Sequence, residues 1–328
     1  MLKSQVLHLR ELMQSSLSRH AVRHLSPSFP YPHSSPRRRT AARPQKRCAA
    51  ESVKASTVDL DQIVGGESED CELPWWSRTY CGYQERFVQP FELPLGGDRA
   101  LTLTQAPRIS AAHSAEASGS SDGGATTGAT VWDAGIVLAA HLLQRPRGAG
   151  GAGGVCLDLG SGTGIVGLAA AASGAFSRVL LSDMPSVVPL LSDNLQRNAD
   201  VLPRGGAPVH AVALRWDDAA QLERVRAMGP FELIVGGDIL YREQVVQPLM
   251  MAVGALATER TTVLLSASLQ HSPSTIRAFA VAATEAGFEV RALETSAQHA
   301  DWTSPEVRLL QLRRRTGATR TLAYWSDN

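Results

Sequence analysis

The hydrophobic pattern of the chain changes character near residue 130, where low-complexity sequence gives way to regularly alternating segments. Short, almost continuously apolar runs recur beyond this point, and helix-type runs separate them. The apolar runs are VCLDLG, RVLLSD, VHAVALRW, FELIVGGDIL and TVLLSAS, and the helical runs include PSVVPLLSDNLQRNA and YREQVVQPLMMAVGAL. Continuously apolar strands that alternate with helices indicate βαβ units, and hence a parallel sheet covered on both faces.

Two further segments extend this pattern toward the C-terminus. STIRAFAVAATEAGFEV predicts one more helix and strand, and EVRLLQLRRR supplies a late strand that can return antiparallel beside it. The count is about seven strands. The sequence therefore predicts an α/β domain over residues 131–315, built on a doubly wound, mostly parallel seven-stranded sheet.

An N-terminal β-hairpin is predicted over residues 87–106, just before the α/β region. The segment alternates in the manner of two strands, and its Gly-Gly-Asp sequence at residues 96–98 is typical of a hairpin turn. Proline lacks the N–H that a ladder needs, so Pro90 and Pro94 are expected to confine the hairpin to a sheet edge.

The remaining segments are not expected to form a core. Residues 58–86 make an irregular acidic segment, residues 107–130 make a low-complexity Ala/Ser/Gly loop, and residues 316–328 make a tail. Residues 1–57 form a basic head. Before residue 55 the chain holds eleven of its 32 Lys and Arg residues but two of its 31 acids.

The composition of the basic head indicates where in the cell the protein is located. Its Ser- and Arg-rich composition is typical of an organelle transit peptide, which would place the protein in a chloroplast or mitochondrion; the alternative is a disordered basic tail on a cytoplasmic protein. The chain lacks an uninterrupted apolar stretch of the ~18–20 residues that a membrane span needs, so no membrane partner is expected.

Charge and cysteine usage narrow the function classes further. Beyond the head, 21 basic residues face 29 acidic ones, which argues against a nucleic-acid binder. The four cysteines show no C-x-x-C pairing and no histidines at zinc spacing, so no metal is expected. Cys156 lies within an apolar run and is interpreted as a core residue.

The candidate site is the turn LDLGSGTG at residues 157–164, between a predicted strand and helix. A dinucleotide fingerprint would need glycine where Ile165 stands, and no Gly-Lys-Ser/Thr follows for a P-loop. Asp158 would repel a pyrophosphate but would pair with an ammonium group. S-adenosylmethionine has that ammonium and no phosphate, although an ordinary strand-to-helix turn remains the alternative.

Further candidate residues stand at the ends of neighbouring elements. Asp183 ends the next strand about 20 residues on, where its carboxylate can accept hydrogen bonds from both ribose hydroxyls. Trp132 opens the helix before the sheet and Trp216 closes the third strand; each ring can stack on adenine, or else serve in core or cap packing. Asp238 follows the fourth strand and has a helix N-cap as its alternative role.

Together these residues resemble the seven-strand methyltransferases, and more narrowly methyltransferase family 16, the protein-lysine methyltransferase-like group. The resemblance spans about Phe87 to Leu312 and rests on GATVWDAGIVLAAHL, LDLGSGTGIVGLAAA, LLSDMPSVVPLLSDNLQRN, LRW and FELIVGGDILY. It implies a Rossmann-like class I methyltransferase fold that binds S-adenosylmethionine. The cofactor-binding residues that it implies, besides Asp158, are Trp132, Gly160, Ser161, Gly162, Asp183, Trp216 and Gly237.

The resemblance also implies an activity. The family's D-x-x-Y motif falls on Asp238 and Tyr241, which would face the methyl donor as catalytic residues, and a carboxylate there suits a cationic acceptor such as lysine. The implied function is methyl transfer from S-adenosylmethionine to a protein side chain, with a protein of unknown identity as partner. Transfer to a protein histidine or arginine, transfer to a small molecule, and a non-catalytic cofactor-binding module remain alternatives.

Three positions depart from the family pattern. Asp158 replaces the commoner glutamate, Gly237 the commoner alanine, and Asp217 stands where glycine is usual. None of these changes removes a group that the site needs. The hairpin and the long Ser/Gly loop are particular to this chain, so the resemblance does not identify the target protein.

Overall fold

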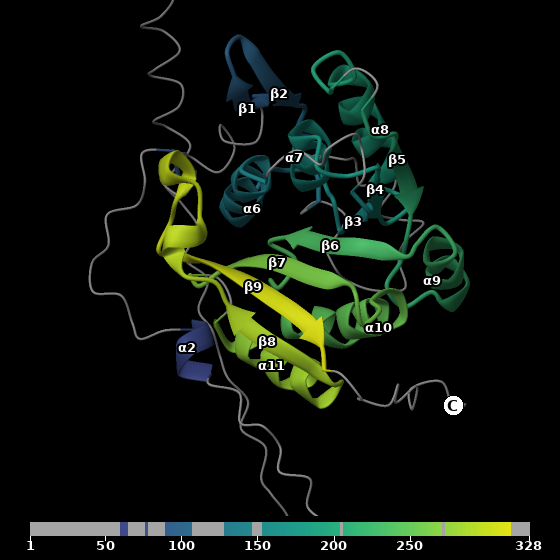
Figure 1. Ribbon diagram of the computed structural model, residues 1–328, viewed down its shortest axis with the longest axis vertical. Helices are drawn as coiled ribbons and strands as arrows, with labels where there is room; N and C mark the ends of the chain where they lie inside the picture. The colour runs from purple at the N-terminus through teal and green to yellow at the C-terminus, as the bar shows by residue number, and fades with distance from the viewer. Residues whose placement is uncertain are drawn as a thin grey trace, which may run out of the picture. The chain divides into compact units, whose positions relative to one another are not determined.

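Seven strands form one sheet, in the order β5-β4-β3-β6-β7-β9-β8, in the computed structural model (Figure 1). The structure describes residues 60–64, 76–77, 89–106, 128–145, 153–203, 206–270 and 273–315. The strands are β1 Phe91–Gly96, β2 Arg99–Leu103, β3 Val155–Leu159, β4 Arg178–Asp183, β5 Val209–Ala213, β6 Phe231–Gly237, β7 Thr262–Ser268, β8 Phe288–Ala292 and β9 Val307–Arg314.

The direction of the strands confirms the predicted fold class. Strands β5, β4, β3, β6 and β7 run parallel to one another, whereas β9 runs antiparallel to both of its neighbours, β7 and β8. The late strand therefore returns antiparallel, as the sequence predicts. The order reverses between β3 and β6, where the chain passes from one half of the sheet to the other.

Helices cover both faces of the sheet, which explains why its strands are apolar on both sides. Helices α6, α7 and α8 lie on one face, and α9, α10 and α11 lie on the other (Figure 1). The helices are α2 Leu60–Val64, α6 Asp133–Leu143, α7 Ile165–Ser173, α8 Val188–Arg197, α9 Ala219–Arg226, α10 Val246–Leu256 and α11 Pro273–Glu285. All residues of α7 are buried, as expected of a helix that is apolar all round.

The predicted hairpin is present, but it does not join the edge of the main sheet. Strands β1 and β2 form a two-stranded antiparallel sheet of their own. Leu93, Leu101 and Leu103 are fully buried in the same apolar cluster as α6 and α7. The hairpin is therefore an outer layer over these helices, because its apolar side chains are buried against theirs.

Two of the strands that form the site end earlier than the hydrophobic pattern predicts. Strand β5 ends at Ala213, so Trp216 lies in the following loop rather than at the end of the strand. Strand β6 ends at Gly237 because Asp238 adopts a left-handed conformation with φ of 56°, which a strand cannot continue. Trp216 is therefore a loop residue rather than a strand residue, and Asp238 lies just past its strand, as the sequence predicts.

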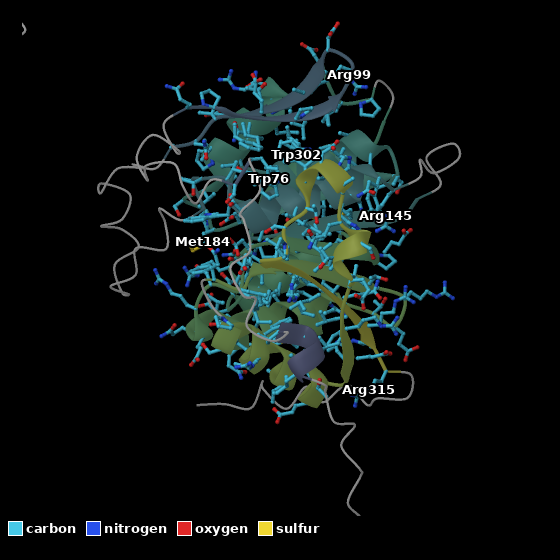
Figure 2. All side chains as sticks on the ribbon, turned by 90° about the vertical axis from the view of Figure 1, so that its left-hand side faces the viewer. Trp76, Arg99, Arg145, Met184, Trp302 and Arg315 are labelled. Atoms are coloured by element: carbon cyan, nitrogen blue, oxygen red, sulfur yellow. The ribbon has the colours of Figure 1, made fainter. Side chains whose placement is uncertain are left out.

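The segment expected to be irregular, residues 58–86, contains the short helix α2. Ile63 and Val64 are buried in the apolar cluster that includes α11 and β9. Farther along, Trp76 lies against Trp302 with ring centroids 5.6 Å apart (Figure 2). Parts of this N-terminal segment therefore belong to the core of the α/β domain.

Several predictions concern parts of the chain outside the described residues. They are the basic head over residues 1–57, most of the low-complexity loop over residues 107–130 and the tail over residues 316–328. Within the described ranges, no helix is both long and apolar enough to cross a membrane.

Candidate functional site

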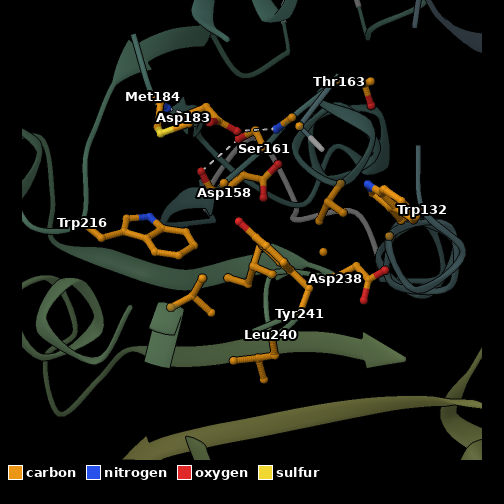
Figure 3. A pocket seen from close by; sticks show the side chains of 18 of the residues that line it. Trp132, Asp158, Ser161, Thr163, Asp183, Met184, Trp216, Asp238, Leu240 and Tyr241 are labelled. Atoms are coloured by element: carbon orange, nitrogen blue, oxygen red, sulfur yellow. Dashed lines mark hydrogen bonds between the residues drawn. The ribbon is translucent and has the colours of Figure 1, made fainter. Parts of the chain in front are cut away.

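A cavity of about 650 Å³ opens where strands β3, β4 and β6 end (Figure 3). It lies at the reversal of strand order between β3 and β6, which is where open α/β sheets bind their ligands. All the predicted site residues line this cavity: Trp132, Asp158, Gly160, Ser161, Gly162, Asp183, Trp216, Gly237, Asp238 and Tyr241.

The glycine turn between β3 and α7 presents bare backbone to the cavity. Gly160 and Gly162 have φ of 63° and 55°, which side chains other than glycine rarely adopt. A Cβ on Gly160 would lie 3.0 Å from Ile239 and 3.1 Å from Trp216, and one on Gly162 would lie 2.7 Å from the Gly128 carbonyl oxygen. Glycine is therefore required at both positions for this turn to fit its surroundings.

Hydrogen bonds to strand β4 hold the turn in place. The Ser161 N–H donates to the Ser182 carbonyl at 2.9 Å, and the Ser182 N–H donates back to the Ser161 hydroxyl oxygen at 2.9 Å. The Gly162 N–H donates to the Asp183 carboxylate at 2.7 Å. These bonds fix the backbone of the turn against the end of β4.

Asp158 is fully buried on the wall of the cavity. Its Oδ2 accepts a hydrogen bond of 2.9 Å from the Gly167 N–H, whereas its Oδ1 has no hydrogen-bond partner among the described residues. Burial raises the pKa of Asp158 from 3.8 to about 7, although the Ser161 hydroxyl and the Gly167 N–H oppose the shift; the neighbouring charge of Asp183 adds a smaller rise. A cationic group in the cavity would supply the missing partner and favour the ionised carboxylate.

Asp183 is the second buried carboxylate of the site. Its Oδ1 accepts from the Met184 N–H at 2.7 Å, and its Oδ2 accepts from Gly162. Burial raises the pKa of Asp183 from 3.8 to about 6, although these two hydrogen bonds oppose the shift. Each oxygen retains a second lone pair, so the carboxylate can still accept hydrogen bonds from ligand hydroxyls.

The two tryptophans lie on different walls of the cavity (Figure 3). Trp132 is the N-cap residue of α6, where its side chain makes no capping hydrogen bond. Trp216 is half-buried and packs against the apolar cluster beneath α9 and α10. Packing and lining the cavity are therefore compatible roles for Trp216.

Asp238 does not cap a helix, so the alternative role that the sequence left open is wrong. The 3-10 helix Glu243–Val245 and helix α10 have Arg242 and Val245 as their N-cap residues. The Asp238 Oδ1 instead accepts from the Ser268 N–H at 3.3 Å. The side chain thus lines the cavity and connects the end of β6 to the end of β7.

Tyr241 completes the predicted motif. In the view of Figure 3 its ring lies between the side chains of Trp216 and Asp238. The Arg242 guanidinium carbon lies 5.5 Å from the Tyr241 ring centroid. This arrangement places a phenol and a carboxylate in the same cavity as the glycine turn.

Sequence reasoning missed several residues that line the cavity, among them Thr130, Thr163, Met184, Arg215, Arg242 and Ser268. Met184 directly follows Asp183, so its position next to a predicted ligand was an available signal. Arg215 directly precedes Trp216 and had the same signal; its guanidinium pairs with the Asp217 carboxylate at 3.0 Å. Among the described residues, no group of three or more His, Cys, Asp or Glu side chains is arranged to hold a metal ion.

The sheet order, with its single reversed strand, and this cavity define a class I methyltransferase. The comparison with protein families identifies the group more closely, because the model described as lysine methyltransferase matches residues 114–278. The chain belongs to this family, methyltransferase family 16, whose cofactor is S-adenosylmethionine.

Individual relatives are similar over part of their length. Over 144 residues the chain is 33% identical to the protein N-lysine methyltransferase METTL21A of Mus musculus, covering 44% of this chain and 62% of that protein. Over 142 residues it is 30% identical to the EEF1A lysine methyltransferase 3 of Mus musculus, covering 43% and 56%. A solved ribosomal protein L11 methylase from Lactobacillus delbrueckii subsp. bulgaricus is 19% identical, covering 54% of this chain and 77% of that one, with a TM-score of 0.38.

Proposed function

We propose that this protein transfers a methyl group from S-adenosylmethionine to the side-chain amine of a lysine in a protein substrate. The observation that carries the proposal is the Asp238 carboxylate, which lines the same cavity as the glycine turn and caps no helix. Family membership and relatives named as protein lysine methyltransferases support the choice of acceptor.

The residues of the cavity fit this cofactor. The unpartnered Oδ1 of buried Asp158 suits the cofactor's ammonium group, and the bare backbone at Gly160 and Gly162 admits close approach. The Asp183 carboxylate suits ribose hydroxyls, and the rings of Trp132 and Trp216 suit adenine. When bound, S-adenosylmethionine supplies a methyl group that its sulfonium already activates.

The acceptor side of the cavity has to bind a cation and then favour its neutral form. A free lysine has a pKa of about 10.4, so its amine must lose a proton before it can attack the methyl carbon. The Asp238 carboxylate attracts and orients the incoming ammonium, and Tyr241 limits the directions that the amine can take. Removal of water and the cofactor's positive charge both lower the pKa of the bound amine.

The basic head supports a location for this activity. We propose that residues 1–57 direct the protein into a chloroplast or mitochondrion. A fusion of these residues to a fluorescent protein should be imported, whereas a fusion in which their arginines are replaced by glutamine should stay in the cytoplasm. Cytoplasmic fluorescence from both fusions would contradict the proposal.

The test of the activity uses Asp238→Asn, because asparagine tolerates the left-handed backbone at this position. Transfer of radiolabelled methyl groups to proteins in organelle and cytosolic extracts should fall by roughly 10²-fold or more. Binding of S-adenosylhomocysteine, measured by calorimetry, should be nearly unchanged.

Asp193→Asn serves as the control, because Asp193 is an exposed carboxylate on α8 outside the cavity. Mass spectrometry of the labelled band then identifies the modified residue. Normal labelling by Asp238→Asn would remove Asp238 from the mechanism, and a label on a residue other than lysine would overturn the proposed acceptor.

A further inference from the structure

Helix α8 holds the buried Asn194, and its C-cap residue, one turn later, is the buried Asn198; they are 0% and 1% exposed. Their side-chain amides take the place of a neighbouring strand along the free edge of β2. The Thr104 N–H donates to the Asn194 Oδ1 at 2.8 Å, and the Asn194 Nδ2 donates to the Thr104 carbonyl at 3.0 Å.

Asn198 repeats the arrangement at Thr102 of β2, two residues before Thr104. The Thr102 N–H donates to its Oδ1 at 2.8 Å, and its Nδ2 donates to the Thr102 carbonyl at 2.9 Å. The two amides therefore satisfy both backbone groups of Thr102 and of Thr104, as paired peptide groups do in a sheet. This pair of side chains attaches the hairpin to α8.

The two asparagines differ in their second donor bond. The Asn198 Nδ2 donates to the Asn194 carbonyl within α8 at 2.7 Å. The Asn194 Nδ2 instead donates to the Thr163 carbonyl at 3.0 Å. Thr163 belongs to the glycine turn and lines the cavity, so Asn194 connects the hairpin to the turn directly.

The turn needs a support at this point. Thr163 stands between Gly162 and Gly164, which have φ of 55° and 90° and are intrinsically free to take other conformations. The bonds to β4 hold the turn at Ser161 and Gly162, and the bond from Asn194 holds its far side. Without that bond the buried Thr163 carbonyl would lose this partner, which favours rotation of its peptide group.

We propose that Asn194 is a positioning residue for cofactor binding, which couples the hairpin to the glycine turn. The inference rests on the proposed function in one respect, namely that this turn holds S-adenosylmethionine. Asn194 does not itself line the cavity, so it acts through the Thr163 peptide.

The test compares Asn194→Ala with Asn198→Ala. Both variants lose two hydrogen bonds to β2 and should be destabilised to a similar extent, but Asn194→Ala alone loses a bond to the turn. In calorimetry well below the unfolding temperature, Asn194→Ala should bind S-adenosylhomocysteine about tenfold more weakly than the wild type, and Asn198→Ala should bind it almost normally. Equal dissociation constants for the two variants would overturn the inference.

A measurement on the wild-type protein does not depend on the folding of either variant. S-adenosylhomocysteine should slow amide hydrogen exchange at Thr104, which bonds to Asn194, by about tenfold more than at Thr102, which bonds to Asn198. An equal effect at both amides would overturn the coupling while leaving the proposed function intact. A wild-type protein that does not bind S-adenosylhomocysteine would overturn the proposed function itself.

Discussion

The Asp183 carboxylate accepts a hydrogen bond of 2.7 Å from the Gly162 N–H, which ties the end of β4 to the turn that follows β3. The residue suited to bind the ribose therefore also supports the turn that lies beside it. Replacing Asp183 would therefore disturb ribose binding and the conformation of the turn at the same time. Changes at the glycines and at Asp158 separate these effects more cleanly.

Gly162→Ala should abolish cofactor binding. A methyl group there would lie 2.7 Å from the Gly128 carbonyl oxygen, in a backbone conformation that disfavours a Cβ by roughly 1–2 kcal/mol. Gly97→Ala is the matched control, because Gly97 has a similar φ of 61° with nothing within 4 Å of the added atom. Calorimetry with S-adenosylhomocysteine should show full binding for the control, and equal losses in both variants would contradict the steric argument.

Cofactor affinity should rise with pH through neutrality. Asp158 has a pKa raised to about 7, and the ligand's ammonium binds its ionised form. Between pH 6 and pH 8 the ionised fraction of such a group grows about tenfold, so the dissociation constant of S-adenosylhomocysteine should fall by about that factor. Asp158→Asn should bind more weakly at pH 8 and lose most of this pH dependence, whereas Asp193→Asn should retain it.

The stability of the ligand-free protein should fall as pH rises, whereas cofactor affinity should increase. Because the pKa of Asp158 is 3.8 when unfolded and about 7 when folded, the folded state holds a proton that the unfolded chain has released between these values. The contribution of Asp158 to the free energy of unfolding therefore falls as pH rises from about 4 to about 7. Urea titrations of wild type and Asp158→Asn should converge at low pH and diverge toward pH 7. A constant difference across this range would contradict the assignment.

Gly237→Ala should destabilise this protein, although alanine is the commoner residue in the family. The added methyl group would lie 2.8 Å from the Val166 side chain and 3.0 Å from the Gly135 Cα, so α6 or α7 would have to move. We expect a loss of about 1–3 kcal/mol in the free energy of unfolding. Gly254→Ala, in α10 with nothing within 4 Å, should instead gain up to about 1 kcal/mol.

Truncation should show that α2 belongs to the catalytic domain. A chain that begins at residue 58 keeps Ile63 and Val64, whereas one that begins at residue 66 loses both of these buried side chains. The longer chain should be as stable as the full protein, and the shorter one should lose roughly 3 kcal/mol or more. Equal urea midpoints for the two chains would show that α2 contributes nothing.

Most of the site was predictable from sequence because its residues follow a local rule. Asp158, Asp183 and Asp238 each stand at or just beyond the end of an apolar strand, and parallel strands bring such positions to one edge of the sheet. The departures from prediction come from contacts between distant segments. Asn194 shows no special signal in the sequence, since its role depends on Thr104, which lies 90 residues earlier.

The hairpin and α2 illustrate the same limit on the scale of whole elements. Alternation and a Gly-Gly-Asp turn predict β1 and β2, but their docking depends on the α6 and α7 surface and on the two asparagines of α8. Helix α2 spans five residues, Leu60–Val64, too few to show a helical period. Its stability comes from the partner surface, which no local pattern encodes.

Helix α2 also limits where the proposed transit peptide, residues 1–57, could be cleaved. A processing peptidase that removes the proposed transit peptide would have to hydrolyse a bond upstream of Leu60, because a cut inside the helix would remove apolar side chains from the cluster that includes α11 and β9. Packing of α2 would thereby set the N-terminus of a processed protein, together with the specificity of the peptidase.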